Sequence, residues 1–328
     1  MSLAWRFSVI GLVVVIFAAA FVIGQTLRSS PPRPVVPDGY NCIPGSLIPQ
    51  LKPGASATMT TKYGGFAARF RSSIPASAPA NGLNVGMPFS GTLTMSGGGK
   101  SWVLPRPDTP NVSQINEMCV IAFHREQYPG VMIEGFTGGA HCCEVPVLYL
   151  FDQAEDRYAK VVDMSPDHYK DPHAFDANGG FIPRIVGGQV LLRTGDDRFA
   201  YVFGCYACGA LPIVLDSLSA HGLTDVTGQH PSLVEADARM IWKSAVQALN
   251  GEAAPVQTTP APFAFLAPWV ADECTLGRGA TAWSTIERLQ HEGKLSDTYY
   301  YKETLNHGSF VANLHTYLLR DDYCTGQF

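Results

Sequence analysis

The sequence predicts a mainly β-sheet domain followed by a small α-helical unit. Residues 55–228 contain short runs of β-branched and aromatic residues separated by Gly, Pro, Asn and Asp, a pattern typical of antiparallel strands joined by turns. From residue 229 onward, apolar residues recur at helical intervals instead. The chain also contains 8 cysteines, an even number that is typical of an exported, disulfide-bonded protein. Only 16% of its residues are charged, which favours the same class.

Residues 1–27 are predicted to be an N-terminal membrane anchor or signal. Arg6 precedes Phe7–Gly24, a stretch without a charged residue that is near the minimum length for a membrane-spanning helix. The apolar run continues past Ala18–Ala20, which favours an uncleaved anchor that holds the protein on the inner membrane, facing the periplasm. The alternative is cleavage at these alanines, which would give a soluble periplasmic or secreted protein.

Residues 28–54 are predicted to be a Pro-rich linker. The segment opens with "RSSPPRPVVPDG", Arg28–Gly39, whose prolines favour an extended and semi-rigid chain. Such a spacer would hold the folded part away from the membrane surface.

Residues 55–228 are predicted to form a meander of antiparallel strands. The runs "SATMTTKYGGFAARF", "GVMIEGF", "VPVLYLFD" and "LPIVLDSLSAHGLTDVT" are short and rich in β-branched and aromatic residues. Residues 96–102, "SGGGKSW", lack the first glycine of a phosphate-binding loop and are expected to form a hairpin tip.

Residues 229–328 are predicted to form the helical unit. Helical periodicity covers residues 231–251, 279–296 and 309–324, whereas residues 252–268 have the composition of a Pro/Ala-rich connector. Cys274 and Cys324 flank the last two helices, so a disulfide between them would close this unit.

The cysteines are disulfide candidates, with the nearest neighbours in sequence expected to pair. This arrangement joins Cys42 to Cys119 and Cys274 to Cys324, and leaves the central four to pair among themselves, although spacing alone does not fix connectivity. The full set is Cys42, Cys119, Cys142, Cys143, Cys205, Cys208, Cys274 and Cys324.

The "TGGAHCC" motif carries the strongest chemical candidates. His141, Cys142 and Cys143, together with Cys205 and Cys208 of "GCYACG", have the side chains that zinc or copper(I) prefers, or those of a redox centre. Adjacent residues of an extended strand point to opposite faces, however, so Cys142 and Cys143 do not easily share one tetrahedral metal ion. Disulfides are therefore favoured over a metal site, and a metal site over thiol catalysis.

The segment "GVMIEGFTGGAHCCEVPVLYLFD", residues 130–152, resembles exported bacterial proteins with degenerate FG-GAP/VCBS-like repeats. Residues 196–227 resemble a second repeat of that kind, and the resemblance covers roughly residues 127–227. It implies a β-propeller-like or incomplete-propeller domain built from small antiparallel sheets. Such repeats often carry calcium loops, but "DANGG" (residues 176–180) and "TGDDR" (residues 194–198) lack the alternating acids of a tight calcium site. No cofactor is therefore expected.

The expected function is that of a binding or scaffold protein of the bacterial envelope. The net charge of −5 is spread over the chain without a basic cluster, which argues against nucleic acid as a partner. No catalytic set is recognisable, so the partners expected are the membrane, through residues 7–24, and a protein or glycan of the envelope. Two alternatives stay open: an envelope hydrolase with loop-borne acids, and a metal- or redox-handling protein that uses the His-Cys-Cys element.

Overall fold

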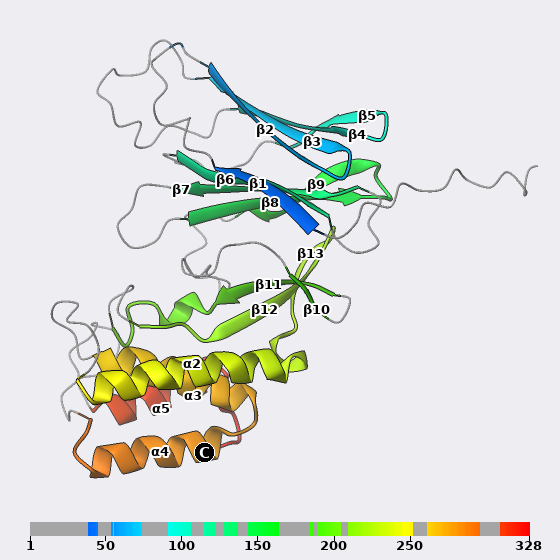
Figure 1. Ribbon diagram of the computed structural model, residues 1–328. Helices are drawn as coiled ribbons and strands as arrows, with labels where there is room; N and C mark the ends of the chain where they lie inside the picture. Colours follow the sequence, from blue (N-terminus) through cyan, green and yellow to red (C-terminus); the bar gives the residue numbers. More distant parts are fainter. Residues whose placement is uncertain are drawn as a thin grey trace, which may run out of the picture.

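The computed structural model places three antiparallel β-sheets and a helical layer on top of one another (Figure 1). This confirms a mainly β-sheet fold with a C-terminal helical unit. The described strands form open sheets, and neither a closed barrel nor a propeller is found among them. The structure describes residues 39–44, 54, 56–73, 91–105, 114–122, 128–136, 144–163, 184–186, 189–204, 209–251, 261–295 and 309–328.

The first layer, called the outer sheet, is a four-stranded meander. Apart from the buried Thr61, its inward-facing buried residues are apolar, and its other face is mostly polar, as expected for a sheet with one buried face. Phe66, Phe70 and Met95 point inward and are almost completely buried. The strands, in spatial order, are β2 (Ser56–Tyr63), β3 (Phe66–Ser73), β4 (Gly91–Gly97) and β5 (Lys100–Val103).

The second layer, called the central sheet, is buried on both faces. Along β8, Val147, Tyr149 and Phe151 pack against the outer sheet, whereas Leu148 and Leu150 pack toward the third layer. A strand buried on both faces needs apolar residues at every position, which explains the uninterrupted run "VLYLF". The strands, in spatial order, are β1 (Gly39–Pro44), β6 (Gln114–Ala122), β7 (Gly130–Phe136), β8 (Glu144–Asp152) and β9 (Arg157–Asp163).

The third layer, called the helix-facing sheet, connects the β domain to the helices. Leu192 and Leu218 belong to the core beneath the central sheet, while Leu191 and Leu215 pack against Val234 of the first helix. The strands, in spatial order, are β10 (Arg184–Val186), β11 (Gln189–Gly195), β12 (Ile213–Ser219) and β13 (Gly222–Asp225), with the short helices η2 (Asp197–Phe199) after β11 and η4 (Thr227–Gln229) after β13.

The fourth layer is helical and is built around one buried helix. Phe263, Leu266 and Val270 of α3 are completely or almost completely buried among the other helices. The helices are α2 (Pro231–Leu249), α3 (Ala261–Thr275), α4 (Gly279–His291) and α5 (Phe310–Arg320).

Helix α3 corrects the expectation of a connector at residues 252–268. Proline in a helix interior removes one i→i−4 hydrogen bond, and here Pro268 leaves the carbonyl of Ala264 without its helical donor. The N–H of Ala210 donates to that carbonyl instead, at 3.1 Å. Because the surrounding layer supplies both the apolar contacts and this hydrogen bond, the helix persists despite its prolines.

Among the described residues there are two disulfides, and both join cysteines that the sequence paired. Cys42 of β1 and Cys119 of β6 are bonded across paired positions of the central sheet. Cys274 at the end of α3 is bonded to Cys324 after α5, which closes the helical unit.

Strand β1 corrects the linker predicted for residues 28–54. Gly39–Pro44 pairs antiparallel with β6 and is fixed there by the Cys42–Cys119 disulfide. The six-residue strand lies between proline-rich and glycine-rich segments, so local composition concealed it. Among the residues that the structure describes, no helix combines the length and the hydropathy needed to span a bilayer. The predicted anchor, Phe7–Gly24, lies outside the described residues.

Candidate functional site

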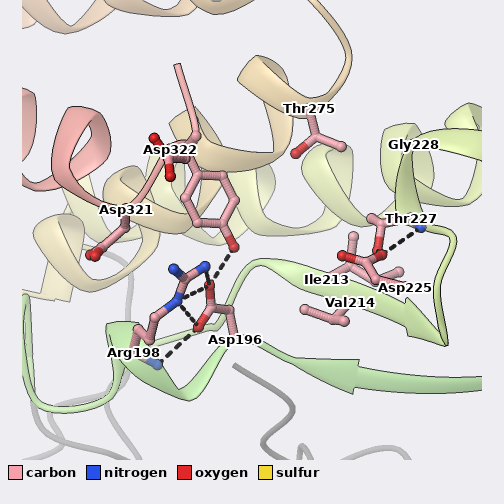
Figure 2. Close-up of a pocket in the computed structure, with 11 residues that line it drawn as sticks. Asp196, Arg198, Ile213, Val214, Asp225, Thr227, Gly228, Thr275, Asp321 and Asp322 are labelled. Atoms are coloured by element: carbon pink, nitrogen blue, oxygen red, sulfur yellow. Dashed lines mark hydrogen bonds and ion pairs between the residues drawn. The ribbon is translucent and has the colours of Figure 1, made fainter. Parts of the chain in front are cut away.

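A cavity of about 390 Å³ lies between the helix-facing sheet and the C-terminal helices (Figure 2). Five separate segments contribute to its wall: the loop after β11, the start of β12, the β13–η4 junction, the end of α3 and the segment after α5. It is lined by Asp196, Arg198, Ile213, Val214, Asp225, Thr227, Gly228, Thr275, Asp321, Asp322 and Tyr323.

One wall is organised by the fully buried carboxylate of Asp196. This side chain accepts hydrogen bonds from the backbone N–H of Arg198 at 3.0 Å and from the Arg198 guanidinium, whose Nη2 lies 2.6 Å from Oδ2 (Figure 2). The hydroxyl of Tyr323 donates to the same Oδ2 at 2.6 Å. A buried charge is tolerated when it is paired and hydrogen-bonded in this way, and the three groups hold one another in fixed positions.

The protonation states of this wall follow from the same contacts. The hydrogen bond to Asp196 raises the pKa of Arg198, so its guanidinium stays charged. Burial, and then the negative charge of Asp196, raise the pKa of Tyr323 well above its usual range, so the phenol keeps the proton that it donates.

Aromatic packing attaches this wall to the helices. The ring of Phe199 packs edge-on against Tyr317 at 5.1 Å and Tyr323 at 5.4 Å between centroids. The hydroxyl of Tyr317 also donates to the backbone carbonyl of Arg198. The loop after β11 is therefore fixed to the last helix and to the segment that follows it.

The opposite wall is the β13–η4 junction. Asp225 Oδ1 accepts from the backbone N–H of Thr227 at 2.8 Å and from its hydroxyl at 2.6 Å (Figure 2). The Thr227 hydroxyl oxygen in turn accepts from the N–H of Leu215 at 2.9 Å. These hydrogen bonds use the hydroxyl hydrogen of Thr227, and the Asp225 side chain that accepts it is exposed.

The cavity has an excess of negative charge. Four aspartates and one arginine line it, and Asp196 is neutralised by Arg198. Asp321 is paired with Arg320 at 2.9 Å, so the exposed carboxylates of Asp225 and Asp322 supply the remaining charge. Such a cavity attracts positively charged or hydroxyl-bearing ligands.

A second acidic pair lies behind the cavity, between the helices and the sheet. Asp237 of α2 is ion-paired with Arg193 of β11, and Asp272 of α3 accepts from the backbone N–H of Ile213 at 3.1 Å. Both carboxyl groups are almost completely buried, and Asp272 Oδ2 has no hydrogen-bond partner among the described residues. Burial, followed by the negative charge of Asp237, raises the pKa of Asp272 well above its usual range.

Metal-ligating side chains do not converge in the described part of the cavity. The only described group of His, Cys, Asp or Glu within ligand distance of one another is Cys42, Glu117 and Cys119, and its two cysteines form a disulfide. The carboxylates of the cavity are thus better placed to contact different parts of one organic ligand than to share one ion.

The sequence candidates are only partly within the described residues. His141, Cys142 and Cys143, which belong to the connection between β7 and β8, and Cys205 and Cys208 all lie outside them. The segment "TGDDR", considered only as a calcium loop, contributes Asp196 and Arg198 to the cavity. Its Asp-x-Arg spacing is the one signal that would have indicated a side-chain ion pair across a tight turn.

Comparisons with protein-family models, with curated protein sequences and with solved structures gave no match for this chain.

Proposed function

We propose that this chain is a membrane-tethered, extracytoplasmic binding protein of the bacterial envelope, and that the cavity binds a small polar ligand. One observation carries the proposal: the cavity wall is held in place by contacts within the chain. Asp196 is saturated by Arg198 and Tyr323, and the Cys274–Cys324 disulfide holds the segment that carries Tyr323. A preorganised wall of this kind lowers the entropic cost of binding.

The disulfides support the proposed location. Structural disulfides persist in oxidising compartments such as the periplasm and are rare in the cytosol. We assign the tether to residues 7–24, which carry the uncharged run, with the inner membrane as its site and the periplasm as the compartment of the folded part.

Binding accounts for the cavity better than catalysis does. No described lining residue is a cysteine or histidine, and the hydroxyls of Thr227 and Thr275 both donate to neighbouring oxygens. A nucleophile with an adjacent free base is therefore lacking among the described lining residues.

The propeller-like architecture belongs to the same proposal. The outer and helix-facing sheets are four-stranded antiparallel meanders, the form that a propeller blade takes. This supports an incomplete-propeller relationship to proteins with FG-GAP/VCBS-like repeats.

The binding proposal is tested with the full-length protein and four probes: a polyamine, an amino sugar, a neutral hexose and a dicarboxylate. We expect the polyamine or the amino sugar to raise the unfolding temperature, because the cavity has excess negative charge. The double variant Asp225→Asn/Asp322→Asn should lose this shift, whereas Glu155→Gln, at an exposed acid in the turn between β8 and β9, should keep it. Equal ligand-induced shifts of the unfolding temperature in both variants, or no shift with any probe, would contradict the proposal that the cavity is the binding site.

A hydrolase is the second candidate, because Asp225 and Asp322 place loop-borne acids in one cavity. Turnover of chromogenic glycosides or peptides that disappears in the same double variant would favour hydrolysis over binding alone.

A further inference from the structure

The exposed face of the outer sheet carries positive charge and hydroxyl groups without an acid. Successive residues of a strand point to opposite faces, so the residues between the buried positions of β2–β5 share the outward face. The exposed or half-buried residues on it are Ser56, Thr58, Thr60, Lys62, Ala67, Arg69, Arg71, Thr92, Thr94, Ser96, Ser101 and Val103.

Strand register arranges these side chains in cross-strand rows. Arg69 lies between Thr60 and Thr94 on the neighbouring strands, and Arg71 is flanked by threonine in the same way. Rows are about 7 Å apart along the strands and neighbours in a row about 5 Å apart. Each guanidinium is thus accompanied by hydroxyl donors on both sides.

The three basic residues of this face are not neutralised by any acid in the described part of the chain. Among the described residues, no acid forms an ion pair with Lys62, Arg69 or Arg71. The face therefore carries three positive charges and no negative one, in a chain whose net charge is −5. In Figure 1 no described element covers this face, and the helices occupy the opposite end of the stack.

The chain enters the folded domain beside this sheet. Gly39, with φ of 146°, begins β1 against the ring of Tyr63, where a side chain would collide with the tyrosine. Two residues later, the Asn41 side chain donates to the carbonyl of Lys62 at 3.0 Å, and the Thr61 hydroxyl donates to the carbonyl of Asn41 at 2.9 Å. The predicted spacer therefore ends next to the β2–β3 hairpin.

We infer that the outward face of the outer sheet docks on the anionic phospholipid headgroups of the membrane that holds the anchor. This inference rests on the proposed tether at residues 7–24. A spacer of about 15 residues spans no more than about 50 Å, so it keeps the hairpin close to the bilayer. Arg69 and Arg71 match phosphate groups through bidentate hydrogen bonds, and the threonine hydroxyls add donors.

Tethering explains why three basic residues are enough for the outer sheet to dock on an anionic membrane surface. Each basic residue near an anionic surface contributes roughly a fivefold factor to binding, which is weak for a free protein. An anchored domain meets the surface at a high effective concentration, so weak contacts are enough to orient it. Docking in this orientation directs the cavity, two layers away, toward the periplasm.

The test uses full-length protein in nanodiscs of phosphatidylglycerol or of phosphatidylcholine. Exposed lysines are acetylated briefly and the modification is located by mass spectrometry. We expect Lys62 to react at least about fivefold more slowly in phosphatidylglycerol discs. Lys243, exposed on α2 in the helical layer, should react equally in both and is the internal control.

Two variants separate charge from fold. Arg69→Gln/Arg71→Gln should abolish the lipid-dependent protection of Lys62, while Arg69→Lys/Arg71→Lys should retain it. High salt should also remove the protection, because it screens exposed charges.

Three results would overturn the inference. If Lys62 reacts equally in both kinds of disc and the chain is retained in them, the docking proposal is wrong while the proposed tether still holds. If the chain does not enter discs of either lipid, both the proposed tether and the docking proposal are wrong. Stronger protection of Lys62 by soluble polygalacturonate than by phosphatidylglycerol assigns the face to an anionic polysaccharide instead.

Discussion

Asp272 is the residue in which burial and hydrogen bonding conflict most directly. Its Oδ1 accepts from the N–H of Ile213, while its Oδ2 is buried without a hydrogen-bond partner among the described residues. Burial, followed by the negative charge of Asp237, raises the pKa of Asp272 well above its usual range. Protonation of Asp272 therefore relieves the cost of burying this carboxyl group.

This arrangement predicts a pH-dependent stability. Unfolded Asp272 ionises near pH 4, whereas the folded protein holds it protonated to higher pH. The stabilisation is therefore complete below about pH 4 and is lost as pH rises through the raised pKa. Asp272→Asn keeps an acceptor for the Ile213 N–H and cannot ionise, so its free energy of unfolding should exceed that of the native protein increasingly from pH 4 to pH 8. Urea titrations at each pH measure this difference.

Asp272→Ala is the matched control for this prediction. It removes the acceptor of the Ile213 N–H, so it should destabilise the protein at every pH. Parallel pH profiles for the native protein and Asp272→Asn would show that Asp272 is not the titrating group.

At the scale of elements, the segment after α5 is the most dependent on cross-links. Tyr323 reaches Asp196, Cys324 is bonded to Cys274, and Gln327 bridges the carbonyl of Cys274 and the N–H of Gly279. These contacts tie the segment to the cavity wall on one side and to the ends of α3 and α4 on the other.

Removing the disulfide should loosen this segment. Cys274→Ala/Cys324→Ala opens a 50-residue connection, which in the chain-entropy account costs about 4 kcal/mol of unfolding free energy. Denaturant titration measures this loss, and ligand-induced thermal shifts should weaken with it because Asp321–Tyr323 line the cavity. Cys42→Ala/Cys119→Ala is the control: it should lower stability while preserving the ligand-induced shift of the protein that remains folded.

Elements that follow a simple pattern were predictable, and those stabilised by their surroundings were not. The sequence of the helix at residues 231–249 has a clear helical periodicity, and the antiparallel strands are separated in the sequence by residues that favour turns. Helix α3 is apolar on all sides and contains Pro268, so only its burial and the Ala210 hydrogen bond reveal it. The cavity was not predictable, because its lining comes from five segments between Asp196 and Tyr323 that only the tertiary fold brings together.

At the scale of the whole molecule, the stack of layers determines how strongly the backbone amides of each strand are protected from hydrogen exchange. Strands β7 and β8 have neighbours on both sides within the sheet and packed layers on both faces. Native-state hydrogen exchange should therefore be slowest for their amides and faster for the edge strands β2 and β5 of the outer sheet. Slower exchange in β2 or β5 than in β8 would show that the central sheet is not the last part to open.

If the chain is exported as proposed, the Cys274–Cys324 disulfide has a consequence for its assembly. A chain that is translocated behind an N-terminal anchor emerges in sequence order, so it presents Cys42 and Cys119 long before Cys324, which follows every other cysteine. The central sheet can thus be oxidised while later residues are still in transit, but the cavity acquires its last wall only when Cys324 arrives. Under this proposal, completion of the cavity is the final step of maturation, and a precursor halted before Cys324 would have a folded β core without the last wall of the proposed binding site.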